Sequence, residues 1–362
     1  MATLATTFGT LQHSRARAGS ASRSRAVARG DVPSEIAAAL RAMDLLAPGD
    51  LPRLIPLSLS GHARVFRAEL GWGTVCLKRA EIASTDAADQ ALADRVDAER
   101  RWLKVAHSAV PGCTPAVLGA FPSGGWLALE SLDEAEFPTW QSRLAGGQVE
   151  PWVAAELGHL TGRLHAATAH SAAVAQHFAG RVAFRTLRIA PGFDRIAAAY
   201  ADCAPQLSRI EAELEATRIV LVHGDLTPEN VLNGPRGPVL LDADCAHYGD
   251  PAADVAAVLA ALCVRMAGHC RLRAEYSASW DAFHRSYAAH AVWELPDRIE
   301  ARAAALIPAF VLAAIEAGSV AGLADGSDAG RAARDAAHDL LLAPPARLDA
   351  LRDAWLDALA GK

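Results

Sequence analysis

The chain changes character near residue 132, and this change limits the folds open to it. Before that point, residues 55–80 and 115–132 consist of short runs of Val, Leu and Phe broken by glycines, a pattern typical of antiparallel strands joined by tight turns. Between them, residues 84–107 contain no Gly or Pro and begin with Ser84 or Thr85, which predicts one helix with either residue as its N-cap. After residue 132, long helical segments dominate.

We therefore expect two lobes, one of five strands and one helix over residues 31–132, and a mainly helical one over residues 133–362. A chain of 362 residues is long enough for two such units. Within the second lobe, residues 218–222 and 237–244 are strand-like exceptions. Residues 1–30 are rich in Arg and Ser and contain no Asp or Glu, which predicts a disordered tail or an organelle-targeting segment.

Composition narrows the possible classes of protein. The chain is 52% hydrophobic and 21% charged, and no apolar run approaches the roughly 18 residues that a membrane span needs, so we expect no membrane partner. A net charge of −6 argues against nucleic-acid binding through a general positive field. The six cysteines are scattered without a C-x-x-C pair, which predicts buried thiols in a reducing compartment. We expect a cytoplasmic protein, with organelle import as the alternative.

The stretch "LVHGDLTPENVL", residues 221–232, is either a polar turn between two strands or a site of chemistry. On its own, Asp225 fits a turn residue that accepts hydrogen bonds from nearby backbone. Asn230 in the same loop and Asp242 at the end of the next apolar run supply the oxygen ligands that Mg²⁺ prefers, which leaves Asp225 to act as a base. The ordered set of His223, Asp225, Asn230 and Asp242 favours a site of chemistry.

Three segments, "HGDLTPEN", "LLDAD" and "YGDPAADVA", resemble the aminoglycoside phosphotransferase and choline kinase group of small-molecule kinases. The resemblance extends from about Ile55 to the C-terminal helices and is strongest over residues 219–258. It implies an α+β, bilobal, protein-kinase-like fold with a small antiparallel-sheet N-lobe and a mainly helical C-lobe. It also implies ATP or GTP with Mg²⁺, and a small-molecule hydroxyl acceptor. In that group Asp225 would orient or deprotonate the hydroxyl, while Asn230 and Asp242 would hold the metal.

The resemblance further implies a lysine on the third strand, paired with a glutamate on the following helix and positioning the nucleotide phosphates. Lys78 is the only lysine among the first 100 residues and stands in the third expected strand. Glu99 follows 21 residues later, inside the expected helix, with Asp97 as a nearby rival. The alternative is that these are ordinary solvated charges.

The phosphate-covering loop departs from the protein-kinase pattern G-x-G-x-x-G, because "LSLSGHARVFRAEL" has a single glycine there. The small-molecule branch commonly lacks the full glycine set. Ser60 and the backbone of Gly61 and His62 are then the expected phosphate contacts, unless the segment is an ordinary hairpin turn. Backbone groups near Glu130 and Leu132 are expected to meet the adenine.

Several further residues have two readings each. His223 is either catalytic or, as the resemblance implies, an anchor of the loop. The resemblance also implies that Asp254 tethers the loop backbone, while Asp244 is either a second metal-side carboxylate or a turn cap. Three aromatic residues could line an acceptor pocket, although aromatics at helical spacing are more often core: Tyr276, Trp280 and Trp293.

The sequence thus predicts ATP-dependent transfer of the γ-phosphate to a hydroxyl of a small molecule, such as an aminoglycoside, a sugar or an amino alcohol. The alternatives are a non-catalytic, nucleotide-binding pseudokinase and a protein kinase. The protein-kinase alternative is disfavoured because no "APE"-like segment follows Asp242 and because Asp254 comes so soon after it.

Overall fold

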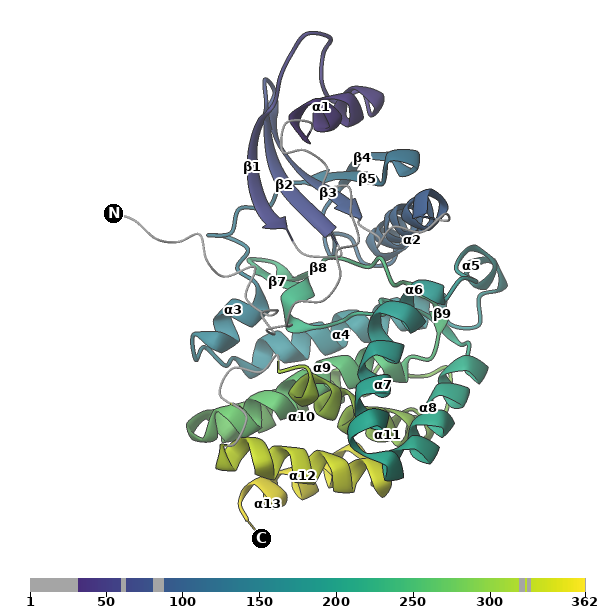
Figure 1. The fold of residues 1–362 in the computed structure, drawn as a ribbon, viewed down its shortest axis with the longest axis vertical. Helices are drawn as coiled ribbons and strands as arrows, with labels where there is room; N and C mark the ends of the chain where they lie inside the picture. The colour runs from purple at the N-terminus through teal and green to yellow at the C-terminus, as the bar shows by residue number, and fades with distance from the viewer. Residues whose placement is uncertain (1–31, 60–62, 81–87, 319–322, 324–326, 362) are drawn as a thin grey trace, which may run out of the picture. The chain divides into compact units, whose positions relative to one another are not determined.

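The computed structural model describes residues 32–59, 63–80, 88–318, 323 and 327–361 (Figure 1). The chain divides into two compact units. The described residues up to Arg100, with Pro115–Leu132, form the first, and Arg101–Thr114 with the residues from Asp133 onward form the second. The boundary falls within helix α2 (Ala88–Ala109).

The first unit contains a five-stranded antiparallel sheet in the order β1-β2-β3-β5-β4. Its strands are β1 (Arg53–Leu59), β2 (Ala63–Leu70), β3 (Gly73–Ala80), β4 (Val117–Phe121) and β5 (Trp126–Glu130). The five strands predicted from the sequence are therefore confirmed. A 3-10 turn, Pro122–Gly124, joins β4 to β5, and Gly125 ends it in the left-handed region at φ +73°, where a side chain would be strained.

The first unit also contains a helix that the sequence analysis did not include, α1 (Val32–Ala42). Ile36 and Leu40 lie one turn apart on this helix and are fully buried, in one cluster with Leu77 and Trp126 of the sheet. The expectation of a single helix in this lobe was therefore wrong. The predicted caps Ser84 and Thr85 of the next helix lie outside the described residues.

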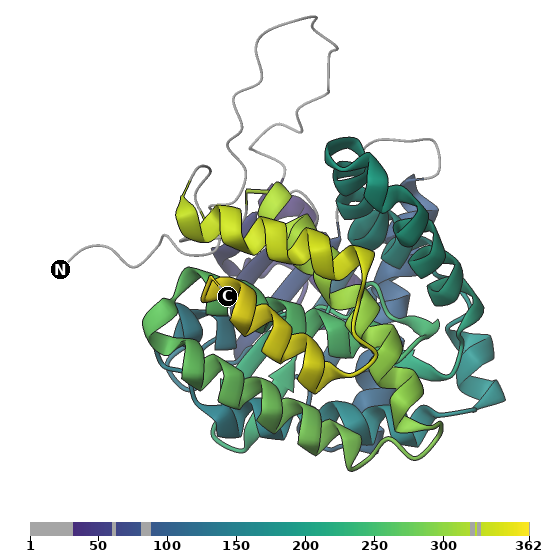
Figure 2. The same cartoon turned by 90° about the horizontal axis from the view of Figure 1, so that it is seen from below.

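The second unit is mainly helical. Its longer helices are α4 (Pro151–Thr168), α7 (Ala190–Ala199), α8 (Ala204–Ala216), α9 (Ala252–Gly268), α10 (Arg273–Ala288), α11 (Pro296–Glu316), α12 (Asp328–Leu342) and α13 (Leu348–Leu359). Shorter helices are α3 (Trp140–Ala145), α5 (Ala172–His177) and α6 (Val182–Phe184). Helix α10 packs along α4 and α11 along α9, while the last two helices, yellow in Figure 2, pack against each other.

Two small antiparallel ribbons interrupt these helices. Strand β6 (Val220–Val222) pairs with β9 (His247–Gly249), and β7 (Val231–Gly234) pairs with β8 (Gly237–Leu240). The strand-like runs seen in the sequence are thus present, although β8 ends at Leu240 and leaves Asp242 in the loop that follows.

Four of the six cysteines are buried, but Cys270 is exposed and Cys76 is half-buried, so the expectation of uniformly buried thiols was wrong. None of the helices in the described part of the chain combines the length and the apolar character that a bilayer crossing requires.

Candidate functional site

The loop after β6 approaches the segment before β9 closely at Gly224. This residue has φ +82°, and a Cβ built on it would lie 2.4 Å from the carbonyl oxygen of Cys245. Only glycine meets both conditions without strain, because other L residues rarely adopt this φ and would collide with the Cys245 backbone. Gly224 therefore fixes the path of the chain just before Asp225.

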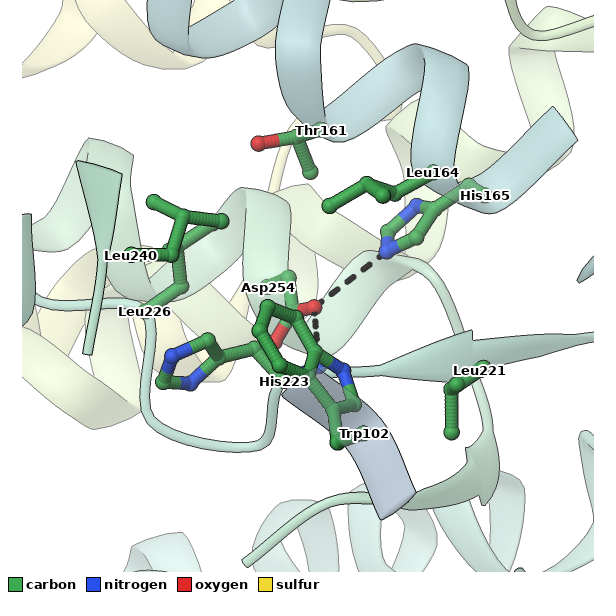
Figure 3. Close-up of a pocket in the computed structure, with 9 residues that line it drawn as sticks. All are labelled: Trp102, Thr161, Leu164, His165, Leu221, His223, Leu226, Leu240 and Asp254. Carbon is green, nitrogen blue, oxygen red and sulfur yellow. Dashed lines mark hydrogen bonds and ion pairs between the residues drawn. The ribbon is translucent and has the colours of Figure 1, made fainter. Parts of the chain in front are cut away.

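Asp254, near the start of α9, binds the backbone of this loop through its carboxylate. Its Oδ2 accepts the backbone N–H of His223 at 2.7 Å, and its Oδ1 accepts that of Gly224 at 2.9 Å. His165 of α4 adds a contact from its Nε2 to Asp254 Oδ2 at 3.2 Å, and Figure 3 shows the Asp254 carboxylate between the His165 ring and the His223 backbone. Burial alone would raise the pKa of Asp254, but the hydrogen bond and charge of His165 outweigh it and lower that pKa.

His223 is buried within the same network and serves as a brace between two segments. Its Nε2 lies 2.9 Å from the carbonyl oxygen of Leu241, and its Nδ1 lies 3.3 Å from the backbone nitrogen of Asp225. Since a carbonyl accepts and an N–H donates, these partners fix the neutral tautomer with the proton on Nε2. Burial lowers the pKa of His223, in keeping with a neutral imidazole. Its position matches the expected loop anchor.

A small cavity lies beside this network and is drawn in Figure 3. Its lining is mostly apolar, with Trp102 packed edge-on against His223 at 4.9 Å between ring centroids. The residues around it are Trp102, Thr161, Leu164, His165, Leu221, His223, Leu226, Leu240 and Asp254.

The carboxylate of Asp225 has two partners, and both bind Oδ2. Arg188 Nη2 lies 2.6 Å away and Asn230 Nδ2 lies 2.8 Å away. Within the described residues, this leaves Oδ1 of Asp225 open to a further donor. Burial raises the pKa of Asp225 to about 7; Arg188 opposes this shift, whereas the charges of Asp242 and Asp244 add to it.

The sequence analysis missed Arg188. It lies in a π-helical turn, Arg185–Ile189, between α6 and α7, and reaches Asp225 across 37 positions of the sequence, so no local motif marks it. Burial opposes its charge, but Asp225, Asp244 and Asp242 together raise the pKa of Arg188 above its usual value. His165 was also missed; its only sequence signal is a histidine directly after the apolar stripe of α4, which consists of Leu157, Leu160 and Leu164 at helical spacing.

Asn230 and Asp242 flank the open end of the β7–β8 ribbon. Val231 pairs with Leu240, and the next backbone bond runs from Leu241 N–H to the Asn230 carbonyl at 2.9 Å, which places Asp242 one residue beyond Asn230's partner. Asp242 has φ +61°, a strained conformation for a residue with a side chain. Such strain is common where a side chain is aimed at a ligand.

The donor set at this end of the ribbon fits Mg²⁺. Because Asn230 gives its Nδ2 hydrogens to Asp225, its amide oxygen is the atom that could bind a metal, with Asp242 just beyond the paired end of the ribbon. Among the described residues, only Asp202, Cys203 and His338 bring three His, Cys, Asp or Glu ligand atoms within 4.8 Å of one another.

In the first unit, Lys78 Nζ on β3 lies 2.7 Å from Glu99 Oε2 on α2. The two side chains are 8% and 3% exposed. The rival Asp97 instead bonds Arg100 on the same helix. The structure thus brings together the two residues that the sequence analysis paired, and it holds them in a site largely closed to water.

The remaining expected residues are placed as follows. Ser60, Gly61 and His62 lie outside the described residues. Glu130 ends β5, where its backbone N–H and its carboxylate both bond Ala116, and Leu132 is the last residue of the first unit. Tyr276 and Trp280 are fully buried, so they belong to the core of the second unit and do not line an acceptor pocket. Trp293 is half-buried against His165 and Tyr287.

Comparison with known proteins covers most of the chain. The model of the family described as "Phosphotransferase enzyme family" matches residues 53–293. The structure is similar to a choline/ethanolamine kinase family protein from Mesorhizobium loti, with 19% identity, a TM-score of 0.52, and coverage of 91% of this chain and 99% of that one. It is also similar to the amicoumacin kinase hAmiN, with 15% identity, a TM-score of 0.52, and coverage of 83% and 90%.

At these identities the two solved structures establish a shared fold, and they confirm the protein-kinase-like class expected from the sequence. No curated protein matches the sequence.

Proposed function

The chain belongs to the phosphotransferase enzyme family, and we propose that it transfers the γ-phosphate of ATP to a hydroxyl group of a small molecule. The observation that carries this proposal is the arrangement around Asp225. Among the described residues, Oδ1 of Asp225 has no hydrogen-bond partner, and the buried loop that carries Asp225 is held by Asp254. Asn230 and Asp242 lie at the adjoining end of the β7–β8 ribbon.

In the proposed reaction, Oδ1 of Asp225 accepts a hydrogen bond from the acceptor hydroxyl and aligns its oxygen with the γ-phosphorus. A new P–O bond forms as the bond to the bridging oxygen of ADP breaks, and the hydroxyl proton passes to Asp225. A carboxylate whose pKa burial raises to about 7 is suited to accept that proton near neutral pH.

Three further residues have proposed roles in binding the nucleotide. Asn230 and Asp242 would hold Mg²⁺, which would supply positive charge to offset the β- and γ-phosphates. Lys78, held in place by Glu99, would contact the α- and β-phosphates. Asp244 is buried close to Asp225 and would add negative charge on the metal side.

The test is binding and turnover of the nucleotide. Wild type should bind a non-hydrolysable ATP analogue only with Mg²⁺, seen as a rise in melting temperature, and Asp242→Ala should lose that rise. Mg²⁺-independent binding would contradict the proposal and favour the nucleotide-binding pseudokinase, and no binding at all would contradict both. A hydroxyl panel of aminoglycosides, sugars and amino alcohols with labelled ATP then identifies the acceptor, and generic protein substrates test the protein-kinase alternative.

A further inference from the structure

Arg188 contacts Asp225, the carboxylate proposed to receive the acceptor hydroxyl. Its Nη2 contacts Asp225 Oδ2 at 2.6 Å, so any hydroxyl bound to that carboxylate lies next to the guanidinium. The Arg188 side chain is 32% exposed while that of Asp225 is 11% exposed. The cation is therefore the more accessible member of the pair.

The guanidinium has capacity for another anion. It carries five N–H donors in a planar fork; one nitrogen is used by Asp225, and the Cys245 side chain also interacts with the guanidinium. Its buried Nε has no hydrogen-bond partner among the described residues. Arginine binds carboxylates and phosphates through two parallel bonds, which a single ion pair to Asp225 does not satisfy.

The positive charge beside Asp225 comes from outside the loop of residues 223–230. Residues 223–230 contain no Lys or Arg, so Arg188 brings the positive charge from the π-helical turn between α6 and α7 (Figure 1). Turns of this kind occur frequently at functional sites. The neighbouring arginines are placed differently, since Arg181 is bound to Glu215 and Arg185 is exposed.

We propose that Arg188 selects acceptors that carry a carboxylate or another anionic group within two or three carbons of the reacting hydroxyl. The inference rests on the proposed function. A hydroxyl on Asp225 and an anion on Arg188 can be bridged by one small molecule because the two side chains are in contact. A cationic acceptor would place its charge beside a guanidinium in a partly desolvated site, where like charges repel more strongly than in water.

A rival explanation is that Arg188 only offsets the charges of Asp225, Asp242 and Asp244, which all act on it. The two explanations differ in what the loss of Arg188 does. A general charge offset affects every acceptor alike and acts on kcat. Recognition of the acceptor affects the anionic acceptors alone and acts on their KM.

The experiment uses matched acceptors that differ in charge: glycerate, glycerol and aminopropanediol, and gluconate, glucose and glucosamine. Wild type should prefer the anionic member of each set at saturating Mg²⁺ and ATP. Arg188→Gln should raise the KM of that member about tenfold or more with a smaller change in kcat, and should leave the KM of the cationic member unchanged or lower. Arg188→Lys should restore part of the loss, and Arg185→Gln, an exposed neighbour, should behave as wild type.

Preference of wild type for the cationic members would overturn the proposal. So would an Arg188→Gln variant in which kcat falls equally for all acceptors, or in which the KM of ATP rises and that of the anionic acceptor does not. Binding of the Mg²⁺ complex of the ATP analogue, measured in parallel, distinguishes failure of the proposed function from failure of the proposed selectivity. Wild type that does not bind it refutes the proposed function. Wild type that binds it but neither binds nor phosphorylates an anionic member at millimolar concentration refutes the selectivity alone.

Discussion

Lys78 and Glu99 form an ion pair of 2.7 Å with both side chains more than nine-tenths buried. Two charges are costly to remove from water, and a pair in this setting repays the cost only when both members are present. The pair joins the middle strand of the sheet to α2 and fixes the Lys78 ammonium at one place. The pair is thus a structural element of the first unit, and its Lys78 ammonium is also a candidate phosphate ligand.

We predict that Lys78→Met lowers the free energy of unfolding by about 3 kcal/mol, because the Glu99 carboxylate remains buried without its ammonium. Glu99→Gln should cost a similar amount. The double variant should be more stable than the sum of the two losses implies, with a coupling of about 1–3 kcal/mol. Urea titrations of the four proteins measure this cycle, and additive losses would contradict a coupled buried pair. All three variants should lose phosphoryl transfer.

The candidate site residues that could be singled out from the sequence are those marked by local pattern or by the family resemblance. Asp225 and Asn230 stand in one loop, Asp242 follows the next apolar run, and Lys78 is the lone lysine of the expected third strand. Arg188 could not be found in this way. Its contact with Asp225 exists only after the helices of the second unit pack, and neither its neighbours nor its spacing mark it.

The same limit applies to the fold. Strands and long helices follow from apolar periodicity and turn residues, and these predictions are confirmed. Helix α1 was missed because it is short and follows an Arg-rich segment, and β9 because a three-residue strand has no periodicity to read. His165 was absorbed into the apolar stripe of α4, since its partner Asp254 is 89 positions away.

A second prediction concerns the loop tether. Asp254→Asn replaces an acceptor of two backbone N–H groups with an amide that can accept only through its oxygen, so one N–H of His223 or Gly224 loses its bond. We expect kcat to fall about tenfold or more because Asp225 is displaced, with nucleotide affinity nearly unchanged. His165→Gln keeps both backbone bonds and should cost less in kcat. Steady-state kinetics measures kcat of both variants, and a larger fall in kcat for His165→Gln than for Asp254→Asn would contradict the prediction.

A third prediction concerns pH and stability. His247 is buried on β9 with its Nδ1 3.0 Å from the Cys245 carbonyl oxygen, and burial lowers the pKa of His247 from 6.5 to about 4. The unfolded chain therefore takes up the proton first as pH falls. The stability that neutral His247 contributes is complete above about pH 6.5 and is lost between there and pH 4, by about 3 kcal/mol at most.

The measurement is the difference in unfolding free energy between wild type and His247→Gln, taken by urea titration at several pH values. The contributions of other titrating groups, Asp225 among them, cancel in this difference of unfolding free energies. Wild type should lose its advantage over the variant as pH falls through this window. A difference that stays constant with pH would show that His247 does not titrate in this way.

The central claim is that Asp225 directs phosphoryl transfer to a hydroxyl. The most direct measurement follows the label from γ-labelled ATP into the acceptor identified by the panel, for wild type and for Asp225→Asn, which keeps the shape and the hydrogen bonds to Oδ2 but cannot accept the proton. The account predicts labelled acceptor with wild type and a rate at least about 100-fold lower with Asp225→Asn, at equal affinity for the Mg²⁺ complex of the ATP analogue. Transfer by Asp225→Asn at the wild-type rate would contradict it.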